Sequence, residues 1–243
     1  MRDALSLAED LAESVLFPNA LETDRSELVP VSNLDALAEA GLYGLFGPES
    51  DGGFGADLRT ASAVVERIAS GCLTTALVWL QHHALVGSLL MGAEPLRSEW
   101  LPEVTTGVRR SGIVFTGLIP GPSTLNATRQ GDKWVIDGQA PWVSGWGRID
   151  TLQVAARGPE ETVVTVALDQ LDRPDLTAVR HRLAALDASG TVRLSFDGLV
   201  VEDDRVLSIV PHDPGSVNGV SLRLNGSLAL GVARRCCSLI GPS

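Results

Sequence analysis

The chain contains 243 residues, of which 44% are hydrophobic and 20% are charged. This length and composition fit one large or two small globular domains and exclude a disordered or fibrous protein. The net charge of −11 has the wrong sign for binding nucleic acid or an anionic membrane surface. We therefore expect no nucleic acid and no membrane among the partners of this protein.

The cysteines and the first residues of the chain indicate its compartment. Three cysteines cannot all pair with one another, and Cys236 and Cys237 are adjacent, which favours a reducing environment. Acidic residues interrupt the first apolar stripe, so we expect no secretory signal, and the most apolar stretch, 76–92, is too short and too polar to cross a bilayer. These features predict a cytoplasmic protein.

Apolar residues recur at helical spacing through the first 110 residues. One such stripe covers residues 5–16, and another covers 34–42 and closes at Gly41. After a glycine-rich break at 47–55, the pattern predicts three more helices, listed here by range: 58–69, 73–90 and 94–104. The first part of the chain is therefore expected to be helical.

From residue 111 the period of the apolar residues changes to two. Short runs rich in β-branched residues predict antiparallel strands at 113–116, 133–136, 152–156, 163–168 and 191–196. The Asp137-Gly138 pair lies between two such runs and predicts a hairpin turn. After Pro214 the helical spacing returns and continues from 216 or 217 to 239.

These patterns together predict an α+β fold in three parts. We expect an N-terminal helical domain over residues 1–110 and a middle, antiparallel, β-barrel-like domain over 111–213. Residues 214–243 are expected to form the first helix of an incomplete C-terminal helical domain.

Most catalytic motifs are missing from the sequence. It has no phosphate-binding loop, no Gly-x-Ser-x-Gly, no Cys-x-x-Cys and no His-Glu-x-x-His. Neighbouring helical positions point about 100° apart, so His82 and His83 cannot readily share a metal ion, and we predict no metal site. His82 has two interpretations: a buried ring that makes hydrogen bonds within the protein, or a residue that lines an acyl pocket.

Several segments resemble one family in their residues, order and spacing. They are the glycine-rich stretch 41–55, Phe115-Thr116, the strand 131–139, the Pro-Trp-Val-Ser-Gly of 141–145 and the strand 196–201. In this order they resemble the acyl-CoA dehydrogenases, and the resemblance extends over nearly the whole chain. It implies the helical and β domains of that family, followed by only the start of its third, helical domain.

The resemblance implies a flavoprotein that holds FAD against its β domain. The implied cofactor-binding residues are Phe115, Thr116, Trp142, Val143 and Ser144. Trp142 would stack near the isoalloxazine ring and Ser144 would bond to its edge, and strand periodicity places these two side chains on one face. The alternative is that Trp142 is an ordinary core aromatic and Ser144 a turn residue.

The resemblance also implies α,β-dehydrogenation of an acyl thioester such as an acyl-CoA, with transfer of the electrons to an acceptor protein and assembly into a homo- or hetero-oligomer. Ser123 and His82 are the implied substrate-binding residues. The loop 116–124 departs from the family because it lacks acidic residues and contains Pro120 and Pro122, which have no backbone N–H.

The catalytic carboxylate is not found at the expected place. The early position in the third domain aligns near Leu222, and residues 216–243 contain no Asp or Glu, so we expect this chain not to dehydrogenate acyl-CoA by itself. Glu94 and Glu99 are the alternative bases within the chain. Two other functions fit the same scaffold: a flavin-dependent monooxygenase and a non-catalytic subunit that completes the site of a partner chain.

Overall fold

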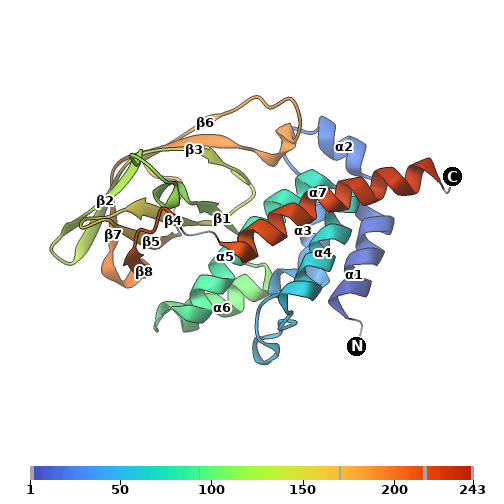
Figure 1. Ribbon diagram of the computed structural model, residues 1–243, viewed down its shortest axis with the longest axis horizontal. Helices are drawn as coiled ribbons and strands as arrows, with labels where there is room; N and C mark the ends of the chain where they lie inside the picture. Colours follow the sequence, from blue (N-terminus) through green and yellow to red (C-terminus); the bar gives the residue numbers. More distant parts are fainter. Residues whose placement is uncertain (1–2, 93, 170, 216–217, 242–243) are drawn as a thin grey trace.

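The computed structural model describes residues 3–92, 94–169, 171–215 and 218–241. Helices form one side of the molecule and a twisted sheet forms the other, and a last helix lies across the helical side (Figure 1). The predicted α+β fold, with helices before the sheet and a helix after it, is therefore confirmed. None of the helices described is long and apolar enough to cross a membrane.

The helical side is built from the predicted helices and one that the pattern missed. Its members are α1 (Ala4–Leu11), α2 (Ala20–Arg25), α3 (Val31–Glu39), α4 (Leu58–Gly71), α5 (Leu73–Met91) and α6 (Leu96–Thr106). Asp3 caps α1 and Asp57 caps α4, because each side chain accepts a hydrogen bond from a backbone N–H of the first turn. The short helix α2 has too few residues to show a period.

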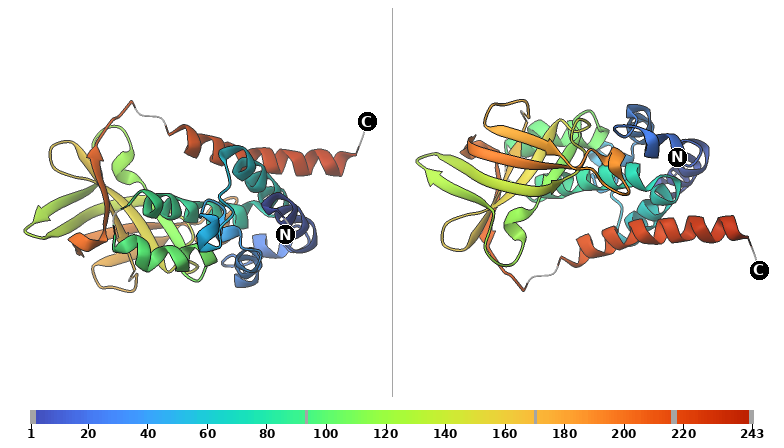
Figure 2. Two further views of the ribbon diagram at one scale, coloured as in Figure 1. Left: turned by 90° about the horizontal axis from the view of Figure 1, so that it is seen from below. Right: turned by 90° about the horizontal axis from the view of Figure 1, so that it is seen from above.

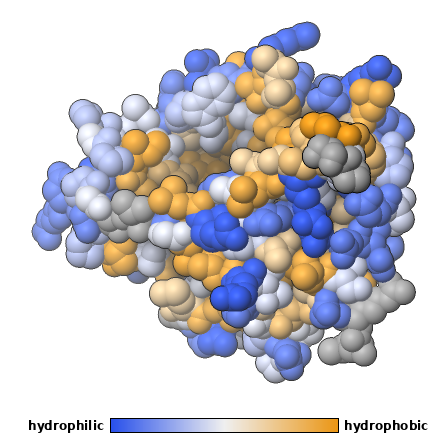
Figure 3. Space-filling view, turned by 45° about the vertical axis from the view of Figure 1, so that its right-hand side comes forward, coloured by the Kyte–Doolittle hydropathy of each residue, from blue (hydrophilic) through white to orange (hydrophobic). Residues whose placement is uncertain are grey.

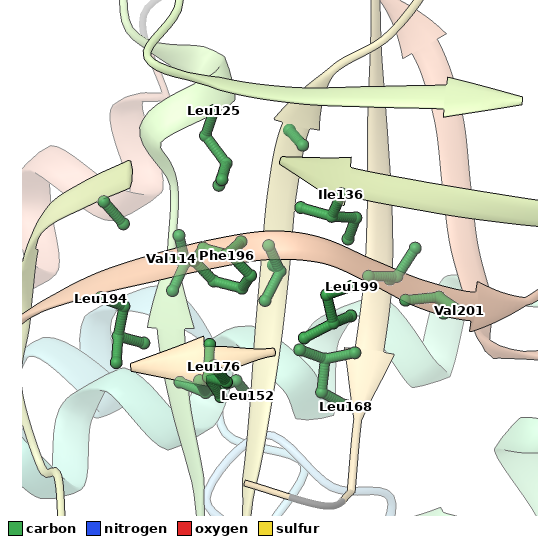
Figure 4. Packing of buried hydrophobic residues seen from close by; sticks show 14 of the residues in the cluster. Val114, Leu125, Ile136, Leu152, Leu168, Leu176, Leu194, Phe196, Leu199 and Val201 are labelled. Atoms are coloured by element: carbon green, nitrogen blue, oxygen red, sulfur yellow. The ribbon is translucent and has the colours of Figure 1, made fainter. Parts of the chain in front are cut away.

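The sheet has the strand order β6-β7-β3-β2-β4-β5-β8, with β1 paired to β4. Its strands are β1 (Ser111–Val114), β2 (Leu125–Gln130), β3 (Lys133–Val143), β4 (Thr151–Arg157), β5 (Thr162–Leu168), β6 (Leu176–Arg180), β7 (Val192–Glu202) and β8 (Val206–Pro211). Their apolar side chains meet in one core between the strands, where Ile136, Leu152 and Phe196 point toward one another (Figure 4).

The expectation of a purely antiparallel sheet is wrong at β4, which has two parallel pairings. β1 pairs with β4 in parallel, and Asn126 of β2 also pairs in parallel with Arg157 of β4. A parallel pair needs a crossover of a dozen or more residues, and the β2–β3 hairpin supplies this length between β1 and β4. The sheet is therefore mixed.

The predicted hairpin turn at Asp137-Gly138 is also wrong, because β3 runs through both residues. The chain turns instead at Gly131-Asp132, between the paired residues Gln130 and Lys133. At Gly138 the register against β7 shifts. Its φ is +122°, and a Cβ there would collide with the Thr124 carbonyl oxygen. The Asp-Gly pair thus marks a bulge where the backbone approaches a neighbouring segment closely.

The last helix, α7 (Gly219–Ile240), packs against α4 along one side of the helical domain (Figure 2). The two helices come close at Gly231, where a Cβ would lie 2.5 Å from the Glu66 carbonyl oxygen. Arg235 donates to the Ser70 carbonyl oxygen at 2.8 Å and to the Glu13 carboxylate at 2.6 Å. The predicted start of this helix at 216 or 217 lies outside the described residues.

Candidate functional site

The predicted cofactor residues lie on two segments of the sheet domain. Phe115 and Thr116 directly follow β1 and begin a turn of 3₁₀ helix, Thr116–Leu118, whereas Trp142 and Val143 end β3 and Ser144 directly follows it. The start of β1 and the end of β3 are adjacent, because a Cβ on Gly112 would lie 3.4 Å from the Ser144 carbonyl oxygen. The fold therefore brings the end of β3 next to the start of β1, whereas Phe115 and Thr116 follow the other end of β1.

Trp142 is the most accessible of these residues, with 64% of its surface exposed. One face of its indole ring is covered by the His181 imidazole, which is stacked at 4.4 Å between ring centroids. His181 is held in turn by donation from its Nε2 to the Pro141 carbonyl oxygen at 2.7 Å. Trp142 is therefore not an ordinary core aromatic; it is a supported aromatic surface with its other face open.

Val143 and Ser144, the two residues after Trp142, differ in whether their side chains can contact a ligand. Val143 is completely buried in the sheet core, so its side chain cannot reach a cofactor. Ser144 is half-buried, and its hydroxyl is 2.8 Å from the Thr191 hydroxyl, which is 2.7 Å from the Ser189 hydroxyl. Each hydroxyl has one proton and two lone pairs, so this chain of three can present a donor or an acceptor to a ligand at Ser144.

The Thr116 turn lies directly against β4. A Cβ on Gly117 would lie 2.5 Å from the carbonyl carbon of Ala156, so only glycine allows this approach. Thr116 itself is largely buried. Ser123 follows later in the same loop, and its hydroxyl donates to the Leu125 carbonyl oxygen at 2.6 Å. This bond ties Ser123 to the start of β2, and its contact with a substrate stays a prediction.

The geometry of His82 is that of a buried ring that makes hydrogen bonds within the protein. It is buried on α5, its Nε2 donates to the Val104 carbonyl oxygen at 2.9 Å, and its Nδ1 accepts from the Ser111 backbone N–H at 3.1 Å. Burial lowers the pKa of His82 to about 4, which keeps the ring neutral. Both nitrogens thus join α6 to β1, and neither is free for an acyl pocket.

The neighbouring His83 is a feature that the sequence reasoning missed. It is buried, neither ring nitrogen has a hydrogen-bond partner among the described residues, and the same is true of Trp79 Nε1 one turn earlier. The His83 ring packs edge-on against Trp79 and Phe46. Burial holds the pKa of His83 well below its ordinary value. The adjacent histidines were a visible signal, but only the fold distinguishes the bonded ring from the unbonded one.

One surface cavity lies away from the predicted cofactor residues. A cavity of about 540 Å³ lies between α3 and the loops that flank β1 and β4, where Arg110 forms an ion pair with Asp35 at 2.6 Å. None of the predicted cofactor residues lines it. Figure 3 shows one face of the molecule, with a hollow in which apolar residues gather. Within the described part of the chain, no cluster of three or more His, Cys, Asp or Glu residues could hold a metal ion.

The chain thus combines a helical domain, a mixed sheet with an exposed tryptophan at the end of β3, and a further helix. A family model described as "Acyl-CoA dehydrogenase, N-terminal domain" matches residues 2–108. Benzylmalonyl-CoA dehydrogenase of Aromatoleum aromaticum is 30% identical over 234 residues, covering 89% of this chain and 60% of that protein. The short-chain specific acyl-CoA dehydrogenase of Rattus norvegicus is 24% identical, covering 96% and 58%.

The solved structures agree on the fold. A glutaryl-CoA dehydrogenase from Mycobacterium smegmatis, in complex with FADH2, has a TM-score of 0.77 at 20% identity, covering 94% of this chain and 59% of that one. Dibenzothiophene monooxygenase (TdsC) from Paenibacillus sp. A11-2 has a TM-score of 0.76 at 23% identity, covering 97% and 63%. Residues 2–108 thus match the N-terminal domain of the acyl-CoA dehydrogenase family, and relatives with acyl-CoA dehydrogenase names are similar to nearly the whole chain. It spans 58% to 60% of the length of the relatives described above.

Proposed function

We propose that this chain is a flavoprotein of acyl-CoA dehydrogenase type that binds FAD against the end of β3. The observation that carries the proposal is the indole ring of Trp142, which is covered by His181 on one face and open on the other. An open aromatic face beside the Ser144 hydroxyl suits a flat ring with polar edge atoms. The residues present therefore fit a flavin, and Thr116 would approach the same ring from the turn after β1.

Bound FAD would supply the hydride acceptor for α,β-dehydrogenation of an acyl thioester. The residues of this chain would orient the flavin ring. Trp142 provides the apolar contact, and Ser144, supported by Thr191, offers a hydroxyl to a polar edge atom. Val143 fixes the strand end by its burial in the core, so the two flanking side chains project from a rigid position.

We propose that the catalytic base comes from residues other than those of α7. No Asp or Glu occurs over residues 216–243, and Leu222, near the expected position, is exposed on α7. The two carboxylates considered within the chain have other roles. Glu94 accepts from the Ser98 backbone N–H at 3.1 Å, and Glu99 forms an ion pair with Arg205 at 3.4 Å. Removal of the substrate α proton needs a carboxylate within hydrogen-bond reach, which a partner chain or further residues would supply.

A second candidate, a flavin-dependent monooxygenase, is favoured by the likeness of the fold to that of TdsC. The altered loop 116–124, with Pro120 and Pro122 and no acidic residue, agrees with a protein that does not grip acyl-CoA. A third candidate is a subunit that completes the site of a complementary chain. The dehydrogenase would also need an electron-acceptor protein and, as we propose, an oligomer.

Three measurements on the purified chain together test the three functions. The purified chain is loaded with FAD and titrated anaerobically with a panel of acyl-CoAs while the flavin absorbance is recorded. We expect flavin to bind and not to bleach at a catalytic rate, because the base is absent; rapid bleaching would refute that part. Oxygen consumption with reduced flavin from a supplied reductase supports the monooxygenase, and a colourless chain that gains flavin only with a partner supports the subunit.

A further inference from the structure

Arg157, the last residue of β4, is the side chain that holds the Thr116 turn. Its Nε and Nη2 both lie 3.3 Å from the Gly117 carbonyl oxygen, and Nη2 lies 3.2 Å from the Ile119 carbonyl oxygen. Only 12% of the side chain is exposed. A guanidinium has five N–H donors in a fixed fork, so one residue can bind two carbonyl groups that face it from the same turn.

Two further groups fix the guanidinium from its other side. The His212 Nε2 lies 2.9 Å from Nη2, and the Glu161 carboxylate lies 3.3 Å from Nη1. Because arginine remains protonated and can only donate, His212 must accept through a neutral ring that carries its proton on Nδ1. The His212 backbone N–H donates to the Glu161 carbonyl oxygen at 2.7 Å. The end of β8 and the β4–β5 turn are thus joined around Arg157.

The backbone of the same turn packs closely against β4. The close approach of Gly117 to Ala155 and Ala156 leaves no room for a side chain there. The turn makes two hydrogen bonds of its own, from the Leu118 N–H to the Phe115 carbonyl and from the Ile119 N–H to the Thr116 carbonyl. The side chains of Leu118 and Ile119 are exposed and contribute little packing. Gly117 and Arg157 thus both hold the turn against β4.

We propose that Arg157, held by His212 and Glu161, is a positioning residue that sets the place of Thr116 and thereby the affinity of the chain for FAD. The part that concerns FAD rests on the proposed function. Arg157 itself stays behind the turn, since its donors are directed at the turn carbonyls. Its removal should loosen the 116–119 segment and leave the Trp142 surface intact.

Hydrogen–deuterium exchange at the Leu118 and Ile119 amides tests the positioning role without any cofactor. In Arg157→Met we expect exchange there to rise about tenfold, the effect of losing charge-assisted hydrogen bonds, with core strands unchanged. Arg173→Met is the matched control, because Arg173 pairs with Asp175 at 2.7 Å and makes no hydrogen bond to the turn among the described residues. His212→Gln keeps an acceptor and should preserve protection, whereas His212→Leu should lose it.

Fluorescence titration with FAD tests the second part of the proposal. The dissociation constant of Arg157→Met should rise about tenfold over wild type, and that of Arg173→Met should not change. Unchanged exchange in Arg157→Met overturns the positioning role; should that variant not fold, unchanged exchange in His212→Leu overturns it. Raised exchange with unchanged FAD affinity overturns the link to the cofactor. Failure of the wild-type chain to bind FAD refutes the proposed function and this link, while exchange still decides the role of Arg157.

Discussion

Replacing His82 with leucine should destabilise the protein by removing two buried hydrogen bonds. Leucine can neither donate to the Val104 carbonyl oxygen nor accept from the Ser111 N–H. Each buried polar group left unpaired costs about 1–3 kcal/mol, so the free energy of unfolding at neutral pH should fall by about 2–5 kcal/mol. The site is completely enclosed, so water cannot readily replace the ring.

The same variant should also change how the free energy of unfolding depends on pH. The pKa of His82 is lowered from 6.5 to about 4 in the folded protein, so between these values the unfolded state binds more protons. The stability that this neutral ring contributes is present above pH 6.5 and is lost as pH falls toward 4, by about 3 kcal/mol in the wild type. His82→Leu has no such loss. The two proteins should therefore approach each other in stability at low pH.

The assay is urea unfolding, followed by tryptophan fluorescence, at a series of pH values from neutral to acid. His83 is present in both proteins, and burial, the main cause of its lowered pKa, is common to both. Gln81→Leu, at the neighbouring half-buried position on α5, is the control and should show a small difference that does not depend on pH. A His82→Leu difference that stays constant with pH, or that vanishes at neutral pH, would refute the reasoning. An altered acyl-CoA affinity with unchanged stability would favour the acyl-pocket interpretation.

Substitutions at three other positions test the site and the packing of α7. Trp142→Ala should raise the FAD dissociation constant about tenfold, since stacking on an aromatic ring contributes about 1–3 kcal/mol, and Trp142→Phe should recover most of the affinity; unchanged titrations would count against Trp142. Ser144→Ala should shift the flavin absorbance bands through loss of one hydrogen bond. An identical spectrum would contradict a hydrogen bond from Ser144 to the flavin. Gly231→Leu should lower the unfolding free energy by about 1–3 kcal/mol through overpacking against α4; an unchanged thermal midpoint would contradict this.

The sequence by itself determined most of the helices and strands, because their periods are local properties of the chain. Alternation predicted Trp142 and Ser144 on one side of a strand; in the structure Val143 between them is buried and Ser144 follows the end of β3. It did not predict α2, β2, β6 or β8. These segments are short or exposed, so their apolar residues do not repeat often enough to show a pattern.

The tertiary structure decided everything that depends on contacts between distant segments. Asp137-Gly138 has the composition of a turn, but the nearness of the Thr124 carbonyl makes it a bulge within β3. His82 had two interpretations until the fold placed Val104 and Ser111 on either side of its ring. Arg157 and His212 are 55 residues apart and carry no motif. Their meeting behind the Thr116 turn follows from strand pairing, which joins residues regardless of their separation along the chain.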